Sequence, residues 1–295
     1  MVDIIKEIEV KGILTKSNLP IAGYSVNPYV GCPHACKYCY ATFMKRFTNH
    51  KEPWGTFLDV KIWKPIKNPN KYKGETIILG SVTDGYHPLE EKFKRTRHFL
   101  EEMQGSGAKL IITTKSDLVI RDLELIKTYP DPLVSWSINT LDEEFHKDMD
   151  MASSIDKRIE AMKQFHDAGI RTTCFISPIF PGITDVRGII ERVEQYCDYI
   201  WLENLNLRGD YKATILNYIS EKYPELMSMY QEIYIENKRD YWESLDQKVH
   251  CYAKGNGYEY LIDKEPFLRS KTGKPIIINY FYHEEIKQTS KNNTK

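Results

Sequence analysis

The middle of the chain alternates short apolar runs with amphipathic stretches. Runs rich in apolar and β-branched residues occupy positions 76–79, 109–113, 133–138, 171–176 and 199–202. Between them, the stretches 93–103, 118–129, 154–168 and 186–197 place apolar residues three and four positions apart, as on one face of a helix. This alternation predicts a parallel sheet with right-handed crossover helices. Because ligands bind at the carboxyl ends of parallel strands, we expect the functional residues there.

The clearest helix lies at 154–168, where Ile155, Ile159, Met162 and Phe165 form one apolar stripe and Gly169 follows as a stop signal. After position 207 the regular alternation fades into helix-like stretches and a strand-like run at 276–282. We therefore predict a barrel at 1–207 and a C-terminal extension at 208–295 packed on it, with a disordered polar tail at 287–295.

Length and charge narrow the class of protein. The 295 residues fit one large α/β barrel or two ordinary domains. Because 41 Lys and Arg balance 41 Asp and Glu, no net field favours nucleic acid or a membrane surface. The sequence also has no signal-like apolar segment and no run near the roughly 20 apolar residues of a membrane span. We expect a cytoplasmic protein that does not bind a membrane.

The strongest local signal is a cluster of cysteines. Three of the six cysteines, Cys32, Cys36 and Cys39, form a C-x3-C-x2-C run in a loop bounded by Gly and Pro. Six unevenly spread cysteines are too few for a secreted disulfide scaffold, so the run indicates metal binding in a reducing compartment. Three thiolates on an iron-sulfur cubane leave one iron open to a small ligand, which suits chemistry at the cluster.

Two other classes of protein fit the same run. A zinc ion can be held by Cys32, Cys36, Cys39 and either His34 or a distant residue, which would make the chain a zinc-stabilised binding module. A cluster can also carry electrons for a partner without binding a substrate. Structural zinc sites usually pair their ligands as C-x2-C twice, and the second pair is missing here, so the spacing favours the cluster.

The run, with an aromatic residue before its last cysteine, resembles the signature of the radical S-adenosylmethionine (SAM) superfamily. The wider strings NPYVGCPHACKYCYA, GSVTDGYHPLE, ITTKSDLVIRD, WSINT and SPIFPGITD are similar to the spore photoproduct lyase-like branch, and they also resemble the radical SAM mobile pair protein B. The resemblance covers residues 11–206. It implies an α/β fold, a partial (β/α)6 radical SAM barrel with a helical and short-strand C-terminal extension.

The resemblance also implies cofactors and an activity. A [4Fe-4S] cluster would cleave S-adenosyl-L-methionine reductively to a 5'-deoxyadenosyl radical, which abstracts hydrogen from a substrate that the sequence does not identify. Cys32, Cys36 and Cys39 would hold the cluster, and Tyr38 would lie against the adenine. The remaining cofactor contacts implied are Gly80, Ser81, Thr83 and Asp84 after the second strand, Lys115 after the third, Ser137 on the fourth, and Glu203 and Asn204 on the sixth.

One departure bears on the reaction. Spore photoproduct lyases return a hydrogen atom from a further cysteine in the turn after the second strand, where this chain has Val82. Valine has no S–H bond, which argues against direct repair of a thymine dimer by that route. Cys174 and Cys251 are the alternative hydrogen donors, although free cysteine is commonly a buried apolar residue.

Substrate and partners stay open at this level. Basic stretches with aromatic residues at 61–73 and 92–97 suit a nucleic acid, and a solvated helical face has the same composition. The alternatives are a nucleic-acid repair or modification lyase and a modifier of a peptide or small molecule, in the lyase or transferase class. The chemistry implies a reductant such as flavodoxin or ferredoxin, and the mobile-pair resemblance implies a second radical SAM protein encoded alongside.

Overall fold

The computed structural model describes residues 2–209, 211–263 and 268–281. Contacts divide the chain into two compact units: Met1–Ser137 with Asp142–Thr172, and Ile138–Leu141 with Thr173–Lys295. These units do not test the sequence-based division at 207 and 208, which stays a prediction. The expected polar tail at 287–295 lies outside the described residues.

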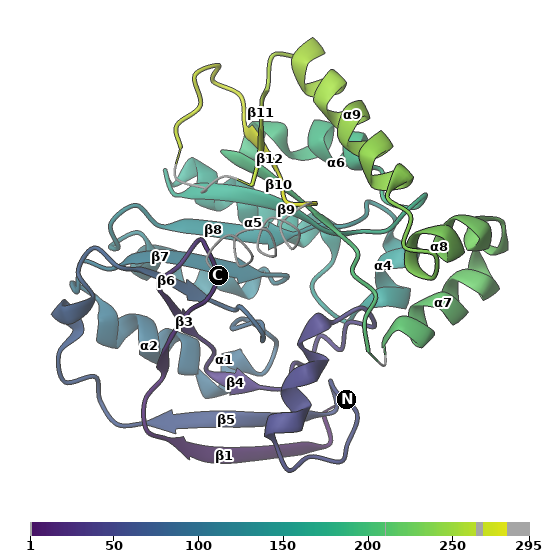
Figure 1. The fold of residues 1–295 in the computed structure, drawn as a ribbon. Coiled ribbons are helices and arrows are strands. Elements are labelled where there is room, and N and C mark those ends of the chain that lie inside the picture. Colours follow the sequence, from purple (N-terminus) through teal and green to yellow (C-terminus); the bar gives the residue numbers. More distant parts are fainter. Residues whose placement is uncertain (1, 210, 264–267, 282–295) are drawn as a thin grey trace, which may run out of the picture. The chain divides into compact units, whose positions relative to one another are not determined.

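The first unit contains two sheets. Their strands are β1 (Ile4–Val10), β2 (Leu14–Lys16), β3 (Tyr24–Val26), β4 (Tyr29–Val30), β5 (Phe57–Trp63), β6 (Thr76–Leu79), β7 (Lys109–Thr114) and β8 (Leu133–Ser137). Strands β3, β6, β7 and β8 pair in parallel in that order, and β2 joins β3 antiparallel. A separate sheet is formed by β5, which pairs in parallel with β1 and antiparallel with β4 (Figure 1).

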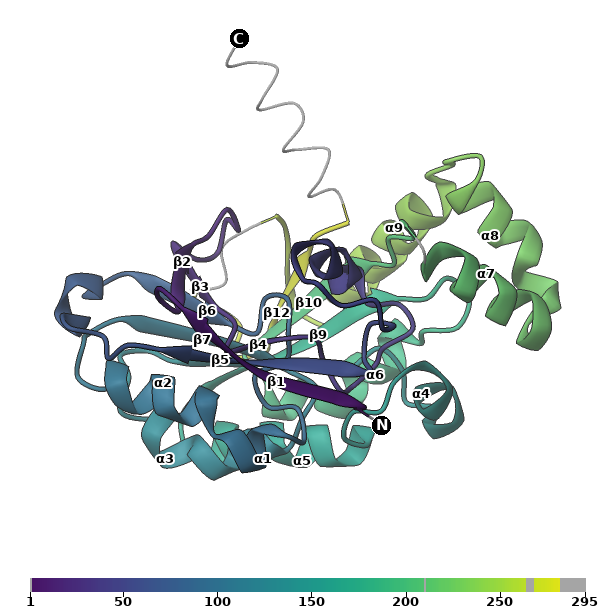
Figure 2. The same cartoon turned by 90° about the horizontal axis from the view of Figure 1, so that it is seen from below.

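Helices α2, α3 and α5 lie on one side of the parallel strands of this unit (Figure 2). The helices of the unit are η1 (Tyr40–Phe47), η2 (Pro69–Tyr72), α1 (Glu90–Phe93), α2 (Arg95–Met103), η3 (Leu118–Asp122), α3 (Leu123–Ile126), α4 (Glu143–Met149) and α5 (Ile155–Asp167). The predicted apolar stripe of α5 is buried throughout. At its end the Phe165 ring meets the Trp136 ring of β8 edge-on, with centroids 5.3 Å apart. Burying one such ring contributes about 2 to 3 kcal/mol.

The stretch 118–129 differs from the single helix that its periodicity predicts. It forms the 3-10 helix η3 and then one turn of α-helix, α3. The Ser116 hydroxyl accepts the Leu118 N–H at 3.1 Å, and such local side-chain bonds favour a tight first turn over a regular α-helix.

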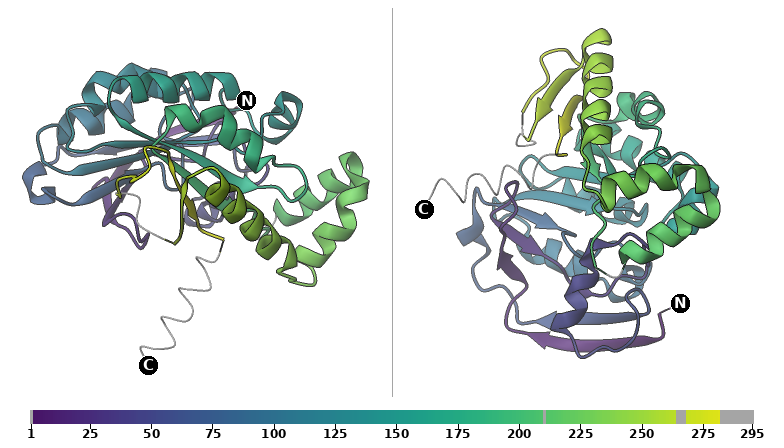
Figure 3. Two further views of the ribbon diagram at one scale, coloured as in Figure 1. Left: turned by 90° about the horizontal axis from the view of Figure 1, so that it is seen from above. Right: turned by 45° about the vertical axis from the view of Figure 1, so that its right-hand side comes forward.

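The second unit adds further parallel strands and the helices that follow them. Its elements are β9 (Arg171–Ile179, from Thr173 onward), α6 (Val186–Val193), η4 (Glu194–Tyr196), β10 (Tyr199–Asn204), α7 (Tyr211–Lys222), η5 (Pro224–Leu226), α8 (Met227–Tyr234), α9 (Asp240–Gly255), β11 (Glu259–Ile262) and β12 (Ile276–Asn279). The strands pair in parallel in the order β9, β10, β12, β11. Figure 3 shows α7 and α8 as a helical pair and α9 beside β11 and β12.

The predicted fold class is confirmed. Parallel pairings involve six strands, β3, β6, β7, β8, β9 and β10, and from β6 to β10 helices alternate with strands along the chain. The helices and short strands expected in the C-terminal part are present. Within the part of the chain that is described, no helix combines the length and apolar character needed to span a membrane.

The close packing of Gly31, the residue after β4, against β5 can be tested by substitution. Its φ is +86°, and an added Cβ would lie 2.3 Å from the Phe57 carbonyl oxygen, whereas Gly74 has φ +79° and open space around the same position. Because left-handed backbone costs an alanine about 1 to 2 kcal/mol, Gly74→Ala should lose that amount. Gly31→Ala should lose about 2 to 5 kcal/mol, since overpacking adds to the strain.

Urea unfolding followed by circular dichroism measures both losses. Equal losses in the two variants would show that the Phe57 carbonyl can move away without cost.

Candidate active site

The cysteine loop follows β4 and is shaped by two consecutive turns. The Ala35 N–H donates to the Cys32 carbonyl at 3.1 Å, and the Cys39 N–H donates to the Cys36 carbonyl at 3.1 Å. Ala35 adopts a left-handed conformation with φ 47°. Cys32 is buried and the other two cysteines are half-buried. Burial raises the pKa of the Cys36 thiol, and the Asp150 carboxylate and the other two thiols raise it further.

Neighbouring segments hold this loop from several sides. The Lys37 N–H donates to the Met149 carbonyl at 2.9 Å, and the Met151 N–H donates to the His34 carbonyl at 2.8 Å. On another side, a Cβ at Gly55 would lie 2.7 Å from the Ala35 Cβ, so glycine allows this close approach. The loop is therefore positioned by contacts along much of the first unit.

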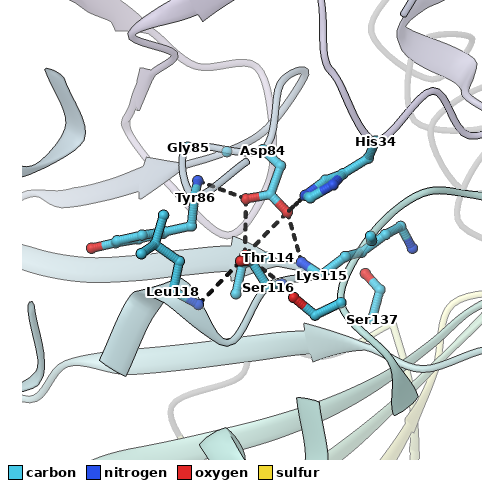
Figure 4. A network of polar contacts seen from close by, with 12 residues as sticks. His34, Asp84, Gly85, Tyr86, Thr114, Lys115, Ser116, Leu118 and Ser137 are labelled. Atoms are coloured by element: carbon cyan, nitrogen blue, oxygen red, sulfur yellow. Dashed lines mark hydrogen bonds and ion pairs between the residues drawn. The ribbon is translucent and has the colours of Figure 1, made fainter. Parts of the chain in front are cut away.

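Asp84 connects the loop to the strand ends (Figure 4). Its carboxylate accepts the Tyr86 N–H at 2.8 Å, the Thr114 hydroxyl at 2.8 Å and the Lys115 N–H at 2.7 Å. The His34 Nε2 lies 3.1 Å from the same carboxylate. Burial by itself would raise the pKa of Asp84, but the His34 hydrogen bond and charge, with the backbone donors, lower it to about 2. Asp84 is thus a buried anion with four partners.

The turn after β6 contains the predicted residues Gly80, Ser81 and Thr83. Gly80 has φ +93°, and a Cβ there would lie 2.4 Å from the Thr113 carbonyl oxygen, so glycine is required. Asn27 clamps the turn, because its amide donates to the Ser81 hydroxyl at 3.0 Å and its carbonyl accepts the Val82 N–H at 3.0 Å. Thr83 is buried, and its hydroxyl has no hydrogen-bond partner among the described residues.

Tyr38 is held by a buried ionic network. Its hydroxyl donates to Asp150 at 2.6 Å. The guanidinium of Arg158, a completely buried side chain, lies 3.1 Å from Asp150 and donates to the Ser137 carbonyl at 3.0 Å. The Lys115 ammonium lies 5.3 Å from the centre of the Tyr38 ring. This network brings together three residues that the sequence analysis named, Tyr38, Lys115 and Ser137.

The network controls the charge of Asp150. Burial alone would raise the pKa of Asp150, but His146, Arg158 and Lys115 together lower it well below its usual range. The His146 Nε2 lies 3.0 Å from the carboxylate. Asp150 therefore stays ionised and keeps both Tyr38 and Arg158 in place. The Arg158 side chain is completely buried, and its guanidinium also donates to the Ser153 carbonyl at 2.7 Å.

The remaining predicted residues belong to the second unit. Glu203 accepts the Ser177 hydroxyl at 2.6 Å. Asn204 ends β10 and lines a cavity of about 400 Å³ with residues of α7, α8 and α9. Cys174 is completely buried in β9, while Cys251 is exposed on α9. The structure assigns no role to these four residues, and their predicted roles stay predictions.

The residues present fit an iron-sulfur cluster. Three thiols sit on one loop, and the buried indole N–H of Trp54 has no hydrogen-bond partner among the described residues. Burial raises the pKa of the Cys39 thiol, and the Trp54 indole is among the groups that oppose this rise. Hydrogen bonds to the sulfurs are typical of cluster sites.

A single zinc ion requires four ligands at about 2.0 to 2.3 Å. Among the residues that the structure describes, no three His, Cys, Asp or Glu side chains are grouped for a single ion. Cys32, Cys36 and Cys39 are among these residues, so this finding does not separate zinc from a cluster, and the zinc alternative stays a prediction.

Several residues of the site were not found from the sequence. Asn27 and His87 lie inside the strings quoted above but were given no role there. Trp54, His146 and Asp150 lie outside those strings, and only the i,i+4 spacing of His146 and Asp150 could have suggested a contact. Their contacts depend on the tertiary fold.

His87, three residues after Asp84, gives a pH-dependent prediction. Its ring is completely buried, packs edge-on against Tyr29 at 4.3 Å, and has no hydrogen-bond partner for either nitrogen among the described residues. Burial lowers the pKa of His87 to about 3. The unfolded chain binds the proton first as pH falls, so His87 should cost about 2 kcal/mol of folding stability between pH 7 and pH 5.

His87→Phe should remove this part of the pH dependence, while the exposed His166→Gln keeps the wild-type profile. Urea unfolding at several pH values measures both. Parallel profiles for wild type and His87→Phe would contradict the prediction.

Comparison with known proteins places the chain in a family. The model of the radical SAM superfamily matches residues 26–193. An uncharacterized protein of Methanocaldococcus jannaschii is 36% identical over 254 residues, which are 86% of this chain and 94% of that protein. A radical SAM Nalpha-GlyT isomerase of Pseudomonas phage M6 is 25% identical over 174 residues, covering 56% of this chain and 36% of the isomerase.

The fold has a counterpart among solved structures. A spore photoproduct lyase mutant with bound AdoMet and dinucleoside spore photoproduct aligns with a TM-score of 0.55 and 17% identity, covering 75% of this chain and 66% of that one. This likeness supports the fold expected from the sequence. Because the family model spans more than half of the chain, the chain belongs to the radical SAM superfamily and is a radical SAM enzyme.

Proposed function

We propose that Cys32, Cys36 and Cys39 hold a [4Fe-4S] cluster and that S-adenosylmethionine binds beside it. When bound and reduced, the cluster supplies the electron that cleaves S-adenosylmethionine to methionine and a 5'-deoxyadenosyl radical, which takes hydrogen from the substrate. The observation that carries the proposal is the Asp84 carboxylate, which joins the cysteine loop through His34 to the strand end at Lys115. This contact supports the proposal, because it joins the loop that contains the three cysteines to the strand end that carries Lys115.

The surrounding residues suit the parts of S-adenosylmethionine. Lys115 supplies a cation for the methionine carboxylate, since charge-assisted bonds to carboxylates are strong. The turn at Gly80 and Ser81, clamped by Asn27, supplies backbone groups for the amino group. Tyr38 provides an aromatic ring for the adenine, and its hydroxyl bond to Asp150 fixes the ring's direction. Asp150 and Arg158 then act as positioning residues.

A first experiment tests the cluster and the cleavage together. After anaerobic reconstitution with iron and sulfide, we expect about four irons per chain, as for a [4Fe-4S] cluster. Dithionite and S-adenosylmethionine should then yield 5'-deoxyadenosine. The variant Cys36→Ala should lose both the cluster and the product.

The exposed Cys251→Ala serves as the matched control, because it removes a thiol that is not part of the C-x3-C-x2-C run. It should keep both the iron content and the 5'-deoxyadenosine yield. Tightly bound zinc without 5'-deoxyadenosine formation in the wild type would overturn the proposal in favour of a zinc-stabilised binding module. A redox-active cluster without cleavage would favour an electron carrier.

Lys115→Met tests cofactor recognition separately. A hydrogen bond to a charged group contributes about 1.5 to 3 kcal/mol, so the variant should bind S-adenosylmethionine about 10- to 150-fold more weakly. Anaerobic calorimetry measures the affinity. The control Lys157→Met removes a lysine that is 67% exposed in the same unit and should leave the affinity unchanged. Equal affinity in the two variants would exclude Lys115 from the site.

For the substrate we propose only a chemical class to test first. The solved spore photoproduct lyase mutant contains a dinucleoside spore photoproduct, which supports testing a nucleic acid first. Peptides and small molecules remain the competing class. Val82 lies where those lyases have a cysteine, so we do not propose the same hydrogen return. Of the two candidate hydrogen donors, Cys251 is exposed, whereas Cys174 is buried in the core.

The proposal also covers the cellular compartment and the protein partners of the enzyme. We expect it in the cytoplasm, where a flavodoxin or ferredoxin can reduce the cluster, with a second radical SAM protein as a further partner. Copurification without any association, and without any mutual effect on turnover, would remove the second protein from the proposal.

A further inference from the structure

The segment that contains the cysteine loop is strongly basic. Residues 11–51 contain no Asp or Glu, although the whole chain has 41 acidic and 41 basic residues. The same segment contains five lysines and one arginine: Lys11, Lys16, Lys37, Lys45, Arg46 and Lys51. This segment thus carries a positive charge within an otherwise neutral chain, and positive charge attracts acidic partners.

Helix η1 presents aromatic side chains on this basic segment. It begins directly after Cys39 and exposes Tyr40 at 60%, Phe43 at 40% and Phe47 at 68% of their surfaces. The Arg46 guanidinium lies 5.3 Å from the centre of the Phe43 ring and 4.9 Å from that of Phe47. We name Tyr40, Phe43, Lys45, Arg46 and Phe47 the η1 face. Exposed apolar patches with aromatic and arginine residues mark interaction sites.

The η1 face is held in place by contacts with neighbouring segments. The Ala41 side chain is buried, and the Tyr40 hydroxyl donates to the Ser81 carbonyl. The Lys45 ammonium donates to the Lys51 carbonyl at 2.9 Å. A face that is fixed before binding loses little conformational entropy when a partner docks.

The position of the face indicates which anionic partner it fits. A substrate must reach the adenosyl group, whereas an electron donor must reach the iron, and electron transfer slows steeply with distance. The η1 face starts at the residue next to a cluster ligand, Cys39. A partner docked there brings its redox centre close to the cluster, which favours the electron donor over a nucleic acid.

We propose that the η1 face is the docking surface for an acidic electron-donor protein of the flavodoxin or ferredoxin type. The inference rests on the proposed function, since it requires a cluster on Cys32, Cys36 and Cys39. The reduced donor loses one electron and the oxidised cluster gains it, with no bond formed or broken. Arg46 and Lys45 steer the acidic donor, and Phe43 and Phe47 form the apolar centre of the contact.

The test compares protein and small-molecule reductants. Reconstituted enzyme is mixed anaerobically with a reduced flavodoxin, and in a second series with a reduced ferredoxin, while the loss of cluster absorbance is followed by stopped flow. The variants are Lys45→Glu/Arg46→Glu and Phe43→Ser/Phe47→Ser. The control Lys71→Glu/Lys73→Glu changes the net charge equally, on exposed lysines at the end of η2.

We expect both η1 variants to lower the second-order rate constant with at least one donor about tenfold or more, and the η2 control to lower it far less. The wild-type rate should also fall as salt rises. Dithionite should reduce the cluster of every variant as fast as that of the wild type, which shows that the cluster is intact.

Three results would overturn the docking surface: wild-type rates in both η1 variants, an equal loss in the η2 control, or no reduction of the wild type by either donor while dithionite succeeds. A face that binds nucleic acid instead would show itself by weaker binding of a labelled single-stranded oligonucleotide to η1 variants that keep the wild-type donor rate. Failure of dithionite with the wild type, or a missing cluster, would count against the proposed function itself.

Discussion

The geometry of the candidate site depends on one buried carboxylate. Asp84 accepts hydrogen bonds from the end of β7 and from its own turn, and it meets His34 inside the cysteine loop. Burying a carboxylate costs free energy of folding unless the carboxylate is paired and hydrogen-bonded. Moving any of its four partners away would therefore destabilise the fold. Because these partners come from three separate segments, the carboxylate fixes their distances from one another. The cysteine loop thus has a defined position relative to the strand ends.

Asp150 is a second buried carboxylate that is held by paired and hydrogen-bonded partners. Asp150 follows α4 and is paired with Arg158 of α5, so the pair couples two neighbouring helices to Tyr38. Removing one member of such a buried pair usually costs about 3 to 5 kcal/mol, because the other charge stays behind without compensation. Neither residue needs to touch a cofactor in order to matter. Their effect is to hold the aromatic ring beside the cysteines in one orientation.

Much of the fold and part of the site could be predicted from the sequence. The strand at 76–79 coincides with β6, and the stripe of α5 is buried as its spacing predicts. Both elements follow from short stretches of sequence, the helix from its three- and four-residue apolar spacing and the strand from its β-branched residues. The sheet formed by β1 and β5 was not predicted, because its two strands are far apart in sequence and β1 is largely exposed. The roles of Asn27 and His146 were not predicted for a similar reason. A single polar residue shows its role only through contacts that the tertiary fold creates.

Gly55 helps to determine whether the cysteine loop keeps its shape without a bound cluster. Its missing side chain lets the segment before β5 press on Ala35, while backbone bonds from Lys37 and Met151 fasten the loop elsewhere. Zinc fingers, in contrast, acquire their shape from the metal and unfold without it. Here contacts of the polypeptide itself hold the loop, so we expect the loop to keep its shape if the proposed cluster is lost to oxygen. The same chain would then accept a new cluster and need not be replaced.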